Sequence, residues 1–204
     1  GFRVREAARK GQAALIVADP REIDLVRDAK LWIRQRSGTD VALIMGMARY
    51  IVEQGLADMD FIRDRCENFD AFCESLTPFV LESVSKITGV PAEDIAQAAR
   101  IYATQKPAAI IYAMGITQHS HGTDNVLALS NLALLTGNVG VPGSGINPLR
   151  GHSNVQGSCD MGAIPTDYPG YQKVADPAAR AKFSRAWGVE LPATPGLTVV
   201  EITN

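Results

Sequence analysis

Two short apolar runs constrain this chain most, because each is followed by a polar loop and then by a segment of helical periodicity. The runs are AALIVA at residues 13–18 and AAIIYAM at residues 108–114. Short apolar runs bounded by turn-forming residues are typical of strands buried in a parallel sheet. The alternation of strand and helix predicts an α/β fold: a Rossmann-like parallel sheet layer flanked by helices, with a less regular C-terminal segment from an adjacent domain.

Periodicity and end signals place the other elements. The segment LWIRQR at residues 31–36 alternates apolar and polar side chains, which predicts a strand with one wet face. An extended tail is expected at residues 197–202. Helices are predicted at residues 2–10, 22–30, 41–54, 59–65, 69–75, 80–86, 91–104, 125–136 and 176–187.

Composition excludes several classes of protein. The 204 residues are 46% hydrophobic and carry a formal charge of −2, with no basic stripe, so nucleic acid is not an expected partner. No apolar run approaches the length of a bilayer span, so no membrane contact is expected. The three cysteines, Cys66, Cys73 and Cys159, form no CxxC pair, which favours buried free thiols and a cytoplasmic location, with the periplasm as the alternative.

Polar residues follow the first two predicted strands, where open α/β sheets commonly hold nucleotides. Asp19 comes directly after the first strand and either binds a nucleotide hydroxyl or ring nitrogen or only caps the turn at Pro20. The turn Ser37–Asp40 precedes the long helix at residues 41–54, whose free N–H groups suit an anion or a polar ring edge. A plain capping turn is the alternative there.

Ten of the eighteen glycines fall between Gly115 and Gly170, which predicts loops that approach a ligand closely. Arg150 lies within this region, and its planar fork suits two-point contact with a small carboxylate, although a structural role is the alternative. His119 and His121 lack a third metal ligand nearby, so either hydrogen bonding or exposure is expected of them and no metal site is predicted.

No GxGxxG or GxxxxGK[ST] fingerprint is present, but four longer motifs carry a resemblance. They are GITQH at residues 115–119, NLALLTGNVG at 131–140, GINPLRG at 145–151 and NVQGSCDMGAIPTDYPGYQ at 154–172. Together with VADPR at 17–21 and SGTDVAL at 37–43 they resemble the large (alpha) subunit of formate dehydrogenases in the molybdopterin oxidoreductase family. The similarity is collinear over the whole chain.

The resemblance implies that the chain is an internal fragment of a longer catalytic subunit. Such subunits oxidise formate to carbon dioxide with a bis-molybdopterin guanine dinucleotide cofactor that holds molybdenum or tungsten, and pass electrons to iron–sulfur clusters. The residue that ligates the metal and a 4Fe-4S cluster are expected in the part upstream of residue 1. The isolated fragment is therefore predicted to be inactive. Implied partners are formate, the remaining domains of the subunit and electron-transfer subunits.

Residue by residue, the resemblance assigns a role near the metal to Arg150, which would orient formate, and to His152, which replaces a common glutamine. Ser153 likewise replaces a common asparagine, so these two departures bear on substrate identity. Met114 and Gln118 match the loop beneath the pterin cofactor. The residues that match segments at its guanine nucleotide end are Ala18, Asp19, Arg21, Gly38, Thr39 and Asp40.

The expected organisation is a Rossmann-like cofactor domain at residues 1–152, followed at residues 153–204 by the incomplete start of the return into an adjacent α/β domain. Two other functions stay open at this point. One is another molybdopterin oxidoreductase with a different substrate, and the other is a nucleotide-binding or assembly module without redox activity.

Overall fold

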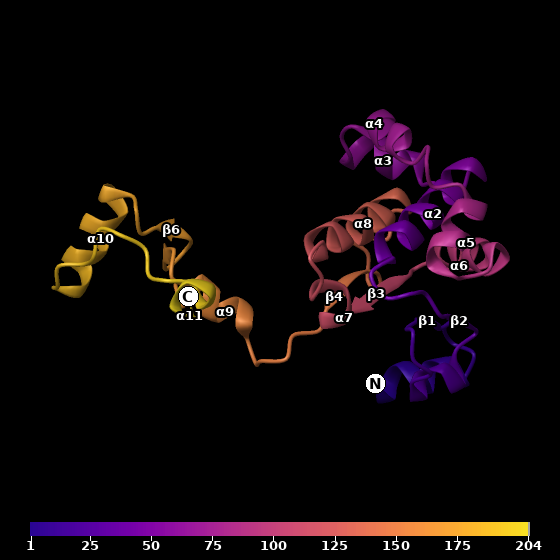
Figure 1. The fold of residues 1–204 in the computed structure, drawn as a ribbon, viewed down its shortest axis with the longest axis horizontal. Coiled ribbons are helices and arrows are strands. Elements are labelled where there is room, and N and C mark those ends of the chain that lie inside the picture. The colour runs from indigo at the N-terminus through magenta and orange to yellow at the C-terminus, as the bar shows by residue number, and fades with distance from the viewer. Residues whose placement is uncertain (204) are drawn as a thin grey trace. The chain divides into compact units, whose positions relative to one another are not determined.

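The computed structural model describes residues 1–203, and the chain divides into two compact units, Gly1–Leu149 and Arg150–Asn204 (Figure 1). The division lies close to residue 152, where the sequence places a domain boundary. Whether the two units correspond to domains of a longer protein stays a prediction. Each unit is described by itself below.

The first unit contains two pairs of parallel strands. Strand β1 (Ile16–Ala18) pairs with β2 (Leu31–Ile33), and β3 (Ala109–Tyr112) pairs with β4 (Gly145–Pro148). Parallel pairs separated by helices confirm the predicted α/β class. The strands form two separate two-stranded sheets among the described residues, and their carboxyl ends carry the polar loops singled out in the sequence.

Eight α-helices and one short 3-10 helix complete the first unit (Figure 1). Helix α5 ends at Gly89, whose φ of 76° is the left-handed conformation that glycine adopts readily, and α6 begins directly after Pro91. The helices are α1 (Phe2–Arg9), η1 (Asp24–Asp28), α2 (Asp40–Glu53), α3 (Met59–Arg65), α4 (Phe69–Ser75), α5 (Leu81–Thr88), α6 (Ala92–Thr104), α7 (Met114–Thr117) and α8 (Gly122–Leu135).

The core of the first unit lies between α2, α5, α6 and α8. Ile51, Val84 and Ile95 are fully buried there. Helices α2 and α5 approach closely at Gly46, where an added Cβ would lie 2.9 Å from the Val84 methyl groups. This core fixes α2 and α8, the two helices whose first turns follow polar loops.

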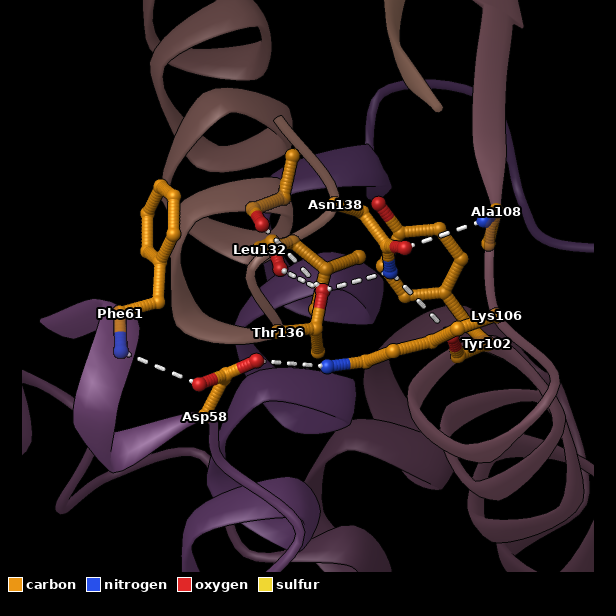
Figure 2. A network of polar contacts seen from close by, with 9 residues as sticks. Asp58, Phe61, Tyr102, Lys106, Ala108, Leu132, Thr136 and Asn138 are labelled. Atoms are coloured by element: carbon orange, nitrogen blue, oxygen red, sulfur yellow. Dashed lines mark hydrogen bonds and ion pairs between the residues drawn. The ribbon is translucent and has the colours of Figure 1, made fainter. Parts of the chain in front are cut away.

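A second set of contacts fixes the amino end of β3 (Figure 2). The Asn138 amide accepts a hydrogen bond from the Ala108 N–H at 3.0 Å and donates to the Thr136 hydroxyl at 2.9 Å. Thr136 donates in turn to the Leu132 carbonyl at 3.0 Å. Asn138 is 1% exposed, so this network ties the strand to the end of α8 inside the protein.

The second unit is built around a small aromatic cluster of Tyr168, Phe183 and Trp187. Asp176 caps the helix that carries two of them by accepting a hydrogen bond from the Ala178 N–H. Its elements are α9 (Val155–Asp160), the antiparallel pair β5 (Asp167–Tyr168) and β6 (Gln172–Lys173), α10 (Pro177–Trp187) and α11 (Val199–Thr203).

Three expectations about strands are wrong. Most of the expected extended tail at residues 197–202 lies in the helix Val199–Thr203, because Thr198 and Glu201 form a reciprocal capping box that outweighs the β propensity of the two valines between them. Residues 145–148 lie in a region expected to form loops, but they form strand β4. This strand has no apolar run of its own and is held by backbone pairing with β3. Strand β3 is not fully buried, since Ile111 is 49% exposed.

Two helix predictions also change. The segment at residues 22–30 forms only the 3-10 helix η1, and the loop at 115–119 contains the single helical turn α7. The cysteines are free thiols, as expected, but they are half-buried instead of buried, and this partial burial raises the pKa of Cys66 and of Cys73. Within residues 1–203, no helix combines the length and apolar character that crossing a bilayer requires.

Candidate functional site

The polar loops singled out in the sequence lie at the carboxyl ends of the two parallel strand pairs. Ala18 is paired with Ile33 in the first pair, and Tyr112 with Pro148 in the second. Because the strands within each pair are parallel, the loops that follow them leave at the same edge. The structure thus groups the predicted residues of the first unit on two sheet edges.

At the first edge, Asp19 shapes the turn that follows β1. Its carboxylate accepts a hydrogen bond from the Arg21 N–H at 2.8 Å, and its backbone carbonyl accepts one from the Trp32 indole at 2.9 Å. Asp19 therefore caps the turn at Pro20, which was one of the two roles expected for it. The Arg21 guanidinium lies 3.8 Å from the same carboxylate and is 83% exposed, so its N–H groups are open to a ligand.

The segment Gly38–Asp40 leads from β2 into α2. Gly38 has a φ of 82° and open space where a side chain would be, so a ligand can approach its backbone. The Thr39 hydroxyl donates to the Arg36 carbonyl at 2.7 Å and does not cap the helix. The first-turn N–H groups of α2 consequently have no side-chain cap, which leaves a partial positive charge at this edge.

Asp40 differs from the other predicted residues because it is buried, at 6% exposure. Its Oδ1 accepts a hydrogen bond from Gln35 Nε2 at 3.2 Å, and its Oδ2 lies 3.9 Å from His119 Nε2. Gln35 was missed in the sequence, although the alternation of Ile33 and Gln35 in LWIRQR places both side chains on the buried face of one segment. His119 was expected to form hydrogen bonds, and it does.

At the second edge, α7 and the start of α8 form a tight corner after β3. Asn125 donates to the Ile116 carbonyl at 2.8 Å, and a Cβ on Gly122 would lie 2.1 Å from the Thr117 carbonyl oxygen. Met114 is 62% exposed and Gln118 is also exposed, so both predicted cofactor residues face out of this corner.

Arg150 follows directly after the other strand of this edge. The Leu149 N–H donates to the Tyr112 carbonyl at 2.7 Å, which extends the pairing of β3 and β4 by one residue. Arg150 and His152 are exposed and begin the second unit. Neither side chain has a hydrogen-bond or ion-pair partner within residues 1–203, so the guanidinium of Arg150 is available to an anion.

The arrangement suits a large polar ligand with anionic groups better than a metal bound by side chains alone. Across the described part of the chain, no three His, Cys, Asp or Glu side chains gather as metal ligands. The first edge instead presents the exposed guanidinium of Arg21, uncapped helix N–H groups and glycine backbone. Such groups bind phosphates and heterocycle edges through charge-assisted hydrogen bonds.

Comparison with known proteins agrees with this chemistry. The chain is 48% identical over 198 residues to "Formate dehydrogenase H" of Escherichia coli (strain K12), which covers 97% of the chain and 28% of that protein. It is 44% identical over 202 residues to the "F420-dependent formate dehydrogenase subunit alpha" of Methanocaldococcus jannaschii, which covers 99% of the chain and 30% of that protein. The chain thus spans less than a third of the length of these relatives.

A solved structure and a family model also match the chain. The structure titled "Acetylene Hydratase from Pelobacter acetylenicus" matches 67% of the chain with a TM-score of 0.65 and 33% identity, and the match covers 19% of that protein. The family model described as "Molybdopterin oxidoreductase" matches residues 1–204. The chain belongs to the molybdopterin oxidoreductase family.

Proposed function

We propose that this chain is an internal part of the large subunit of a formate dehydrogenase, which oxidises formate to carbon dioxide, one proton and two electrons. The observation that carries the proposal is an arginine two residues after β4, Arg150, whose side chain has no partner within residues 1–203, in a chain whose relatives are named formate dehydrogenases. Residues 1–152 would belong to the cofactor domain and residues 153–204 to the start of an adjacent domain. The isolated chain would be inactive.

The residues at the two sheet edges fit a molybdopterin guanine dinucleotide. At the first edge, Arg21 and the uncapped first turn of α2 suit the phosphates and the guanine end, and the backbone at Gly38 is open to close approach. The amide oxygen of Gln35 is buried beside this edge without a partner. Ala18, Asp19 and Thr39 would line this end of the cofactor.

At the second edge, the exposed Met114 and Gln118 would lie against the pterin. When bound, the molybdenum or tungsten centre supplies the acceptor for the two electrons, which would leave toward iron–sulfur clusters and electron-transfer subunits. Arg150 would hold the formate carboxylate through two parallel N–H···O contacts. His152, two residues further on, would lie near the substrate and take part in proton transfer. A cytoplasmic location is proposed with this function.

Replacing Arg150 by lysine in the full-length subunit tests the assignment. Lysine keeps the charge and loses the planar fork, so kcat/KM for formate is expected to fall about 10-fold or more, chiefly through KM. Arg185→Lys on the exposed face of α10 is the matched control and should leave kcat/KM unchanged. Unchanged formate kinetics in Arg150→Lys would remove Arg150 from the site.

A different substrate is the second candidate function. It is favoured by the structural match to a protein titled acetylene hydratase and by His152 and Ser153, which depart from the common residues of formate dehydrogenases. Assays of the full-length subunit with formate, acetylene and nitrate separate the two candidates. Turnover of formate alone supports the first, and turnover of either other compound without formate oxidation supports the second.

A further inference from the structure

Three segments that are far apart in the sequence meet around the carboxylate of Asp40. Gln35 follows β2, Asp40 is the first residue of α2, and His119 follows α7. Gln35 Nε2 lies 3.2 Å from Asp40 Oδ1, and His119 Nε2 lies 3.9 Å from Asp40 Oδ2. The cluster therefore joins the loops of the two sheet edges through side chains alone.

The proton position on His119 follows from its second contact. His119 Nε2 lies 2.9 Å from the Gly115 carbonyl oxygen, and a carbonyl oxygen only accepts hydrogen bonds. Nε2 therefore carries the hydrogen and donates it to Gly115. The same nitrogen lies 3.9 Å from Asp40 Oδ2, which is too far for a hydrogen bond but close enough for electrostatic attraction between the N–H group and the carboxylate.

The corner after β3 is linked to α8 by polar and close backbone contacts, and Ile116 packs against the core cluster to which α2 contributes. Asn125 holds the Ile116 carbonyl, and Gly122 packs against Thr117, so both contacts fix α7 to α8. His119 is the residue of this corner whose side chain reaches Asp40. The contact between His119 and Asp40 is thus a polar link between the loops Gly38–Asp40 and Met114–Gln118.

The buried polar atoms of this cluster make few hydrogen bonds. Gln35 and Asp40 are each 6% exposed, and Gln35 Oε1 has no hydrogen-bond partner among the residues that the structure describes. The carboxylate of Asp40 has one long hydrogen bond and one histidine at 3.9 Å. A buried acceptor without a donor costs stability, so folding alone does not account for this arrangement.

We propose that His119 is a positioning residue that fixes the distance between the Gly38–Asp40 loop and the Met114–Gln118 loop, and thereby sets how tightly the pterin cofactor is retained. The inference rests on the proposed function for the identity of the ligand. Asp40 contributes to this positioning through its contact with His119, because its carboxylate is buried, at 6% exposure.

The test measures pterin retention in the full-length subunit, as the rate at which fluorescent pterin is released from folded protein. His119→Ala removes the N–H group, and release is expected to become about 10-fold faster, which corresponds to the loss of one hydrogen bond to a partly buried group. In His119→Gln the amide nitrogen lies where Nε2 was, so release is expected within about 2-fold of wild type. His119→Asn is too short and should behave like His119→Ala.

Two further variants separate positioning from general damage. His121, which stacks on His119 with ring centroids 5.6 Å apart, provides the matched control, and His121→Gln should leave release unchanged. Asp40→Asn keeps the shape of the side chain and loses its charge, so release should accelerate severalfold. In the double variant, Asp40→Asn should add little to the effect of His119→Ala, because both changes break the same contact between His119 and Asp40.

The inference is overturned if folded His119→Ala retains pterin as wild type does, if His119→Gln releases it as fast as His119→Ala, or if the effects of Asp40→Asn and His119→Ala add fully. If either His119 variant fails to fold, the test rests on Asp40→Asn. A wild-type rate of pterin release from this variant then overturns the proposal. A wild-type subunit that retains pterin and does not oxidise formate refutes the proposed function only, since the retention series is read without substrate.

Discussion

The two ends of β3 carry two polar clusters of opposite character. At the amino end, Asn138 and Thr136 are buried and every polar atom of their side chains has a partner (Figure 2). Beyond the carboxyl end, Asp40 and Gln35 are equally buried, yet the Gln35 oxygen has none. The side chains of Asn138 and Thr136 are therefore fully paired, although the nearby Tyr102 hydroxyl has no partner within residues 1–203, whereas the cluster that His119 reaches beyond the other end of β3 leaves the Gln35 oxygen unpaired.

This difference separates contacts that stabilise the fold from contacts that prepare a site. A satisfied buried network rigidifies the core, whereas an unsatisfied one costs free energy and persists at sites where a ligand or a required geometry accounts for it. The amino-end network should therefore control stability, and the cluster around Asp40 should control cofactor retention. Three changes test that division, beginning with the largest expected effect.

Asn138→Ala should lower the free energy of unfolding by about 2–4 kcal/mol, because the Ala108 N–H and the Thr136 hydroxyl lose their partner inside the protein. Urea unfolding of the full-length subunit, read at the transition of this domain, measures the change. Asn147→Ala is the control, since Asn147 is exposed, and its effect should stay below about 1 kcal/mol. A loss of pterin from folded Asn138→Ala protein would contradict the division.

Gly122→Ala should cost about 2 kcal/mol, because its Cβ would lie 2.1 Å from the Thr117 carbonyl oxygen and the corner after β3 has to shift. Pterin release from folded protein should also become faster, unlike in Asn138→Ala. Gly115→Ala, which has no atom within 4 Å of the added Cβ, is the matched control for stability. Wild-type stability and release in Gly122→Ala would show that the corner is not rigid.

Lys106→Met should have the smallest effect and a defined pH dependence. The hydrogen bond from Lys106, assisted by the Phe61 N–H, holds the pKa of Asp58 below its ordinary 3.8. A lowered pKa contributes stability above that value, and the contribution is lost as the pH falls below 3.8 through the folded-state pKa. Both side chains are about one third exposed, so the difference at neutral pH should be below about 1 kcal/mol.

Urea unfolding at pH 7 and below pH 3 checks this prediction. The wild type and Lys106→Met should converge at the acidic end, because protonated Asp58 no longer pairs with Lys106. Lys10→Met, which removes an exposed pair with Glu6 on α1, is the control and should change stability less. A gap between wild type and Lys106→Met that widens on acidification would contradict the assignment.

Much of the fold followed from local signals in the sequence. The α/β class and most helices were predicted because apolar periodicity, Gly89, Pro91 and the Asp176 cap act within a few residues. Strand β4 was not predicted, because GINP contains glycine and proline and pairs only through the backbone of β3. The C-terminal helix was missed because the capping box of Thr198 and Glu201 was overlooked.

The candidate site was predictable only in part. The sequence placed polar residues after strands, and the structure shows Arg21, Gly38 and Met114 exposed at such positions. The meeting of Gln35, Asp40 and His119 depends on how α2 and α8 pack, which no local pattern encodes. The roles of the site residues, Arg150 and His152 included, came from the family resemblance and stay predictions.

Hydrogen exchange of the full-length subunit, with and without its pterin cofactor, tests the central claim most directly. The account predicts that loading raises protection of the amides at residues 38–40 and 114–118 by about 10-fold or more, while the Ala108 amide, held by Asn138, exchanges at the same rate in both forms. Unchanged exchange in the two loops, with new protection confined to the region around Ala108, would contradict it.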